Sequence, residues 1–84
     1  MVTWQSWAHL EDHFAKHGVE VGTQTVEEFD ASARAVLTRA DIIFGYDDPE
    51  TGFRRVGHYD SATDLFTALN EYGEIVTHFR TTSR

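Results

Sequence analysis

The pattern of the chain changes at Asp41, and this change restricts the fold more than any other feature. Before Asp41, apolar residues recur at steps of three and four, which is the spacing of amphipathic helices. After Asp41, short apolar runs alternate with turn residues, which is typical of strands. Turns this short join antiparallel neighbours, because a parallel connection needs a crossover of about a dozen residues. We therefore expect an α+β fold in which two N-terminal helices pack on one face of a four-stranded antiparallel β-meander.

The two helices are expected over residues 4–17 and 26–40. The first would be capped by Thr3 and ended by Gly18. The second begins with a capping box, Thr25-Val26-Glu27-Glu28. Spacing predicts these buried faces: Trp4, Trp7, Leu10 and Phe14 in the first helix, and Val26, Phe29, Ala33, Val36, Leu37 and Ala40 in the second.

The four strands are expected over residues 42–46, 53–59, 65–69 and 74–80, joined by turns at 47–52, 60–63 and 70–73. Eighty-four residues are too few for two hydrophobic cores, so residues 1–84 are expected to form a single domain. Alternation along the last strand puts Ile75, Thr77 and Phe79 on one face. If Ile75 and Phe79 meet the helices, Thr77 points into the same layer. A threonine between core residues is also an ordinary strand residue.

The charge balance is acidic, with seven Lys and Arg against fourteen Asp and Glu and a net charge of −7. This sign opposes strong general attraction to nucleic acid and suits a basic partner. The chain contains no cysteine, which excludes disulfides and a thiolate nucleophile. No apolar run approaches the roughly 18 residues of a membrane span, and the N-terminus does not resemble a signal peptide. We expect a cytoplasmic protein that does not bind membranes.

Histidines at positions 9, 13 and 17 form a row on one side of the first helix, because they are four residues apart. His17 lies where this row meets the apolar face, His9 lies furthest from it, and Lys16 points away from the core. The row is either a polar helix flank or one wall of a cleft. Histidines at this spacing can also share zinc, but His58 and His78 do not match the spacing of a third ligand. We expect neither a metal nor a cofactor.

A series of short motifs runs through residues 9–80 in a recognisable order. They are His13-x-x-Lys16-His17-Gly18, then Gly22 and Ala33, Tyr59-Asp60-x-x-Thr63-x-x-Phe66, and Gly73-x-Ile75-x-Thr77-x-Phe79-Arg80. The series resembles the small nuclease domains of the barnase–EndoU–colicin–RelE-like superfamily. These domains occur in phage proteins and at the C-termini of bacterial polymorphic and contact-dependent inhibition toxins, where they are often called pyocin large subunit-like. Phe29 and His78 depart from the family pattern, which has tyrosine at the first position and an aromatic or apolar residue at the second.

The resemblance implies a metal-independent endoribonuclease, which in several relatives acts on tRNA and whose expected product is a 2′,3′-cyclic phosphate. It also implies an RNA partner, delivery into the cytoplasm of a target cell in the toxin forms, and a cognate immunity protein. Site residues carried over by the resemblance are His17 as general acid or base with His13 as the alternative, Lys16 and Thr77 at the phosphate, and Arg80, Tyr59 and Thr63 as substrate-binding residues. Imidazoles suit such chemistry because they titrate near neutral pH.

The residues also fit a second function class. The net charge of −7 suits a non-catalytic protein-binding module on the same fold, such as a phage accessory or immunity-like protein that holds a basic partner. Asp60 and the arginine pair also have structural interpretations. Asp60 starts a turn, and Arg54 and Arg55 solvate an outer sheet face or protect an edge, although they could also touch phosphate.

Overall fold

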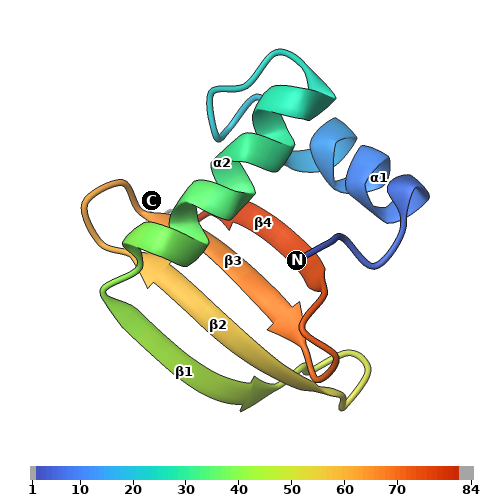
Figure 1. Cartoon of the computed structure of the whole chain (residues 1–84), viewed down its shortest axis with the longest axis vertical. Helices are drawn as coiled ribbons and strands as arrows, with labels where there is room; N and C mark the ends of the chain where they lie inside the picture. The colour runs from blue at the N-terminus through green and yellow to red at the C-terminus, as the bar shows by residue number, and fades with distance from the viewer. Residues whose placement is uncertain (1, 82–84) are drawn as a thin grey trace.

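The computed structural model describes residues 2–81, which form two helices followed by four strands (Figure 1). The sheet is antiparallel with the strand order β1-β2-β3-β4. The expected α+β fold, with two helices ahead of a four-stranded meander, is confirmed. The elements are α1 (Trp7–His17), α2 (Val26–Arg39), β1 (Ile42–Asp47), β2 (Arg54–Asp60), β3 (Leu65–Asn70) and β4 (Ile75–Arg80).

Helix α2 crosses one face of the sheet and supplies most of the core contacts on that face (Figure 1). Its Phe29 and Ala33 are fully buried and pack in one cluster with Ile75 of β4. The N-cap of this helix is Thr25, whose side chain accepts a hydrogen bond from the Glu28 amide at 3.1 Å, as the capping box predicts. It ends at Arg39, one residue earlier than expected.

Helix α1 lies beside β4 and starts three residues later than predicted (Figure 1). Its cap is Ser6, not Thr3, and the Ser6 hydroxyl accepts from the His9 amide at 3.0 Å. Trp4, expected in the helix, instead forms a parallel bridge with Ile75. Backbone groups at the free edge of β4 form hydrogen bonds with the residues before α1, and the Ile75 amide donates to the Thr3 carbonyl at 2.8 Å. Trp7, expected in the buried face, is 59% exposed.

Strand β4 contains an irregularity that changes which residues face α2. Leu69 pairs with Ile75 and Ala68 pairs with Thr77, so Val76 is an extra residue in the strand. The bulge shifts the alternation of side chains by one position. As a result Ile75 packs under α2, whereas Thr77 lies on the opposite face with Phe79. The expectation that Thr77 shares the layer of Ile75 and the helices is therefore wrong.

The sheet face opposite α2 carries a layer of aromatic side chains. Ring centroids of Phe44 and Tyr46 lie 5.7 Å apart, and those of Phe66 and Phe79 lie 5.1 Å apart. Phe66 is 6.0 Å from Phe44, so the layer is continuous across the strands. Offset and tilted contacts of this kind stabilise packing beyond the area that they bury. This layer gives the open face its own hydrophobic cluster, separate from the one under α2.

Observed strand bounds differ from the predicted ones by a single residue at some ends: β1 to β3 each end one residue later, and β2 and β4 each begin one residue later. The turn after β2 forms as Asp60 predicts: its carboxylate accepts from the Ala62 amide at 3.1 Å and from the Thr63 hydroxyl at 2.9 Å. Neither helix in the part of the chain that the structure describes is long and apolar enough to cross a membrane.

Candidate functional site

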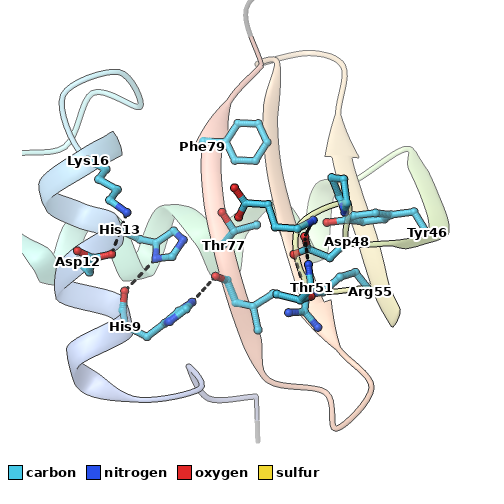
Figure 2. Close-up of a pocket in the computed structure, with 13 residues that line it drawn as sticks. His9, Asp12, His13, Lys16, Tyr46, Asp48, Thr51, Arg55, Thr77 and Phe79 are labelled. Atoms are coloured by element: carbon cyan, nitrogen blue, oxygen red, sulfur yellow. Dashed lines mark hydrogen bonds and ion pairs between the residues drawn. The ribbon is translucent and has the colours of Figure 1, made fainter. Parts of the chain in front are cut away.

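A cleft of about 440 Å³ lies between α1, β4 and the β1–β2 hairpin (Figure 2). Helix α1 forms one wall, β4 forms the floor, and the hairpin turn forms the other wall. The lining residues are His9, Asp12, His13 and Lys16 from α1; Val76, Thr77 and Phe79 from β4; and Tyr46, residues 48–51 and Arg55 from the hairpin.

The helix wall follows from helical geometry. Positions 9, 12, 13 and 16 are spaced at i, i+3, i+4 and i+7, which places them on one face of α1. Leu10 lies on a different face and is buried in the cluster that contains Phe29 and Ile75. One side of α1 is therefore fixed by the core while its polar side faces the cleft.

His13 is held in one tautomer within this wall. Its Nδ1 lies 3.0 Å from the carbonyl oxygen of His9, and a carbonyl only accepts, so Nδ1 donates. This leaves Nε2 of the neutral ring with a free lone pair. Burial lowers the pKa of His13 below its ordinary value. The hydrogen bond to the His9 carbonyl offsets part of this effect, and the nearby charges of His9 and His17 lower the pKa further. Figure 2 shows the ring pointing from α1 toward Thr77.

His9 joins α1 to the edge of the sheet. Its Nε2 donates to the carbonyl oxygen of Val76 at 2.6 Å, so the other ring nitrogen, Nδ1, remains available (Figure 2). The ring centroids of His9 and His13 are 4.4 Å apart. Two imidazoles thus line the cleft side by side. The sequence analysis places His9 furthest from the core and does not include it among the catalytic residues. The helical spacing of positions 9, 13 and 16 would have indicated that His9 shares a face with His13 and Lys16.

Charged groups of both signs line the cleft. The Lys16 ammonium lies 3.2 Å from Asp12 in an exposed ion pair, which contributes little to stability but keeps the ammonium beside the cleft. Arg55 is held more firmly: its side chain is only 12% exposed, and its Nε lies 3.9 Å from Asp48. The pKa of Tyr46 is raised, first by burial and then by the charge of Asp48. Tyr46 was missing from the predicted site, and Arg55 was noted only as a residue that could touch phosphate. Both lie on the same sheet face as Thr77.

His17 does not line the cleft. Its Nδ1 lies 3.2 Å from a carboxylate oxygen of Glu20, and its ring centroid is 5.8 Å from that of Phe79. Neighbouring helix positions diverge by about 100°, so Lys16 and His17 cannot face the same way. Of the predicted catalytic residues, His13, Lys16 and Thr77 line the same cleft, and His17 lies outside its lining.

The three predicted substrate-binding residues lie at the β2–β3 turn and not in the cleft. Arg80 donates from Nε to the carbonyl of Glu20 and from Nη1 to the carbonyl of Thr63, both at 2.7 Å. The Tyr59 hydroxyl donates to Asp64 at 2.5 Å, and Thr63 bonds Asp60. Arg80 pairs with Leu65 across β3 and β4, whereas Thr77 pairs with Ala68, so the strand itself separates the two groups.

His78 is fully buried on the α2 face and serves the core. Its Nε2 lies 2.8 Å from the Ser32 hydroxyl, and its Nδ1 lies 2.9 Å from the Thr67 hydroxyl and 3.0 Å from the Phe66 carbonyl. Burial lowers the pKa of His78 to about 4, so the ring is neutral at pH 7.

Across residues 2–81, no three His, Asp or Glu side chains are grouped in a way that would hold a metal ion. Comparisons of the chain with protein-family models, with curated proteins and with solved structures gave no match.

Proposed function

We propose that this protein is a metal-independent endoribonuclease whose active site is the cleft between α1 and β4. The observation that carries the proposal is that one cleft contains the neutral imidazole of His13, the ammonium of Lys16 and the hydroxyl of Thr77, with His9 beside them. These groups are the acid–base and phosphate-binding groups that RNA cleavage through the ribose 2′-hydroxyl requires.

His13 is the general base in this proposal. Its free Nε2 takes the proton of the 2′-hydroxyl, whose oxygen attacks the adjacent phosphorus. The bond from phosphorus to the 5′-oxygen then breaks, and that oxygen takes a proton from the imidazolium form of His9. The products are a 2′,3′-cyclic phosphate and a 5′-hydroxyl. The lowered pKa of His13 supports this role, because it keeps the base deprotonated at neutral pH.

The phosphate is bound by the remaining polar groups of the cleft. Lys16 offsets the charge that develops on the phosphoryl oxygens, and Thr77 donates a hydrogen bond to one of them. Arg55 supplies a second cation from the opposite wall. Arg80 donates to the carbonyls of Glu20 and Thr63, so we assign it to stabilising the β2–β3 turn and not to binding the substrate.

The test compares two histidines of one helix. Purified wild-type protein, His13→Gln and His17→Gln are incubated with tRNA and with total RNA in EDTA, and circular dichroism verifies that each variant is folded. We expect His13→Gln to lose about 100-fold or more in cleavage rate, the usual contribution of one acid–base group, while His17→Gln retains most of it. Equal activity of His13→Gln and wild type, or no cleavage by any of the proteins, would refute the proposal.

The proposal also implies where the protein acts and what controls it. Cellular RNA as substrate requires action in the cytoplasm, either of the producing cell or of a target cell. A cognate immunity protein would have to cover the cleft. tRNA is the first substrate to test, in line with the resemblance of the sequence.

One observation favours the alternative, a non-catalytic module that binds another protein. Ile42, Ile43 and Phe44 are 48%, 60% and 43% exposed on β1, an edge strand whose outer backbone groups are free to pair with another chain. Capture of a stoichiometric protein by the wild type but not by Ile43→Lys, without RNA cleavage, would support this function. Cleavage that depends on His13 would exclude it.

A further inference from the structure

A second cavity of about 200 Å³ opens beside the cleft, at the end of the sheet where the β1–β2 and β3–β4 turns lie. It is lined by Gln5, Phe53, Arg55, Asn70, Glu71 and Tyr72. Arg55 lines both this cavity and the cleft, so one side chain separates them. Among residues 2–81, those that line this cavity are polar, charged or aromatic, and none is aliphatic.

The two aromatic residues of this cavity have no role in the core. Phe53 is 62% exposed and Tyr72 is 80% exposed, and neither belongs to a hydrophobic cluster. Large aromatic side chains exposed in this way are candidates for binding, because leaving them in water stabilises nothing.

Both aromatic residues are nevertheless held by ordered turns. The Asn70 carboxamide oxygen accepts from the amides of Tyr72 and Glu74, both at 2.9 Å, which fixes the β3–β4 turn. The Phe53 amide donates to the Thr51 hydroxyl at 3.2 Å, and the Phe53 carbonyl accepts from the Asp48 amide at 2.8 Å. The backbone that carries the two rings is therefore held in place before binding, which lowers the backbone entropy lost on binding.

Arg55 connects the aromatic rings to the cleft electrostatically. Its guanidinium carbon lies 5.9 Å from the centre of the Phe53 ring, within the range of a cation–π contact. Arg55 also pairs with Asn70 across β2 and β3, which brings the two turns to the same end of the sheet. A polymer bound in the cleft would reach Phe53 and Tyr72 by passing this one residue.

We propose that the Phe53–Tyr72 cavity binds an unpaired nucleobase of the RNA whose scissile phosphate lies in the cleft. Aromatic rings bind bases by stacking, and the polar groups of Gln5 and Glu71 can contact the base edge. A base in a duplex is already stacked and paired, so the site selects single-stranded RNA. This inference rests on the proposed ribonuclease function and adds the form of RNA that it takes.

The test measures binding separately from cleavage. Fluorescent 2′-O-methyl adenosine oligonucleotides lack the nucleophilic hydroxyl, so their affinity is measured by anisotropy without reaction. We expect wild-type protein to bind the tetranucleotide more tightly than the dinucleotide. Phe53→Ala and Tyr72→Ala should each lower the affinity for the tetranucleotide by about 5- to 150-fold, the range of one base-stacking contact. Their affinity for the dinucleotide should stay within about twofold of the wild-type value. Trp7→Ala, which removes an exposed aromatic residue outside both cavities, should change neither.

The outcomes separate this inference from the proposed function. If wild-type protein cleaves RNA but both substitutions leave tetranucleotide affinity unchanged, the subsite is refuted and the ribonuclease stands. If wild-type protein does not cleave RNA but the substitutions weaken the tetranucleotide selectively, the ribonuclease is refuted and the base site stands. Equal wild-type affinity for the two lengths, or no binding of either, overturns the inference.

Discussion

At the scale of single residues, neighbouring atoms determine what each histidine can do. His13 and His17 lie one helical turn apart and are the same residue type. A backbone carbonyl orients the ring of His13 beside the cleft, whereas His17 lies against Glu20 and Phe79. Of these two histidines, only His13 therefore combines a fixed tautomer, a free nitrogen and a place in the cleft with Thr77.

His78 gives a prediction about pH and stability. Its pKa is about 4 in the folded protein and about 6.5 in an unfolded chain, so between these values the unfolded state binds one more proton. Stability should therefore fall as the pH drops from 6.5 to 4, by about 3 kcal/mol from this residue. His13, whose pKa is also lowered, adds to the fall in the same direction.

Urea unfolding at pH 7 and pH 4.5, followed by tryptophan fluorescence, measures this effect. His78→Gln can keep hydrogen bonds to Ser32 and Thr67 but does not titrate, so its stability should depend less on pH than that of the wild type. The comparison uses the difference between the two pH values, so a general loss of stability in the variant does not affect it. An unchanged pH dependence would contradict the assignment of a neutral, buried His78.

At the scale of elements, the β4 bulge decides which side chains reach the cleft. Without the extra residue at Val76, Thr77 would continue the face of Ile75 under α2. The open face would then lack the hydroxyl that the proposed mechanism uses. The bulge thus allows one short strand to serve the core with Ile75 and His78 and the cleft with Thr77.

Gly57 gives a prediction about the aromatic layer of the open face. A Cβ at this position would lie 2.8 Å from the Phe66 ring and 2.9 Å from the Phe44 ring. Gly57→Ala should therefore lower the free energy of unfolding by about 1–3 kcal/mol, the usual range for overpacking. In the double variant Gly57→Ala/Phe44→Ala, the second change should cost less than it does alone, because Phe44 no longer crowds the new methyl group. Strictly additive effects in urea unfolding would contradict this packing.

The sequence predicts the elements well and the site only in part, for physical reasons that differ between residues. Helical spacing and turn residues are local, so α2 and the four strands appear within a residue of their predicted bounds. Trp4 lies outside α1 because it pairs with the edge of β4, which is distant in the sequence. The periodicity of residues 4–17 does not indicate this tertiary contact. The bulge at Val76 likewise has no sequence marker, which is why Thr77 was assigned to the wrong face. The sequence marks Arg54 and Arg55 only as an exposed pair that could touch phosphate, and it is the hairpin that places Arg55 in the lining of the cleft.

At the scale of the whole molecule, the net charge of −7 opposes RNA binding, and the cleft itself carries acidic groups. Long-range attraction therefore contributes little, and local contacts must supply the affinity. We therefore expect the proposed ribonuclease to bind RNA weakly and to release it readily.

Glu50 gives a prediction at this scale, because it lines the cleft where the phosphate is proposed to bind. Glu50→Gln should lower the KM for RNA by about two- to fivefold at low ionic strength and have little effect in 1 M salt, where exposed charges are screened. Glu27→Gln changes the net charge equally but lies in the first turn of α2, outside the cleft. Equal effects of the two substitutions would show that only total charge matters and would contradict the position of the site.

In the proposed reaction, the ribose 2′-hydroxyl is the nucleophile and His13 promotes its attack. The most direct measurement is the chemistry of the cut ends, obtained by mass spectrometry of a short RNA incubated with the protein in EDTA, beside the same RNA carrying 2′-O-methyl groups. We predict 2′,3′-cyclic phosphate and 5′-hydroxyl ends from the unmodified RNA and no cleavage of the methylated one. Fragments with 5′-phosphate ends, or cleavage of the methylated RNA, would contradict the account.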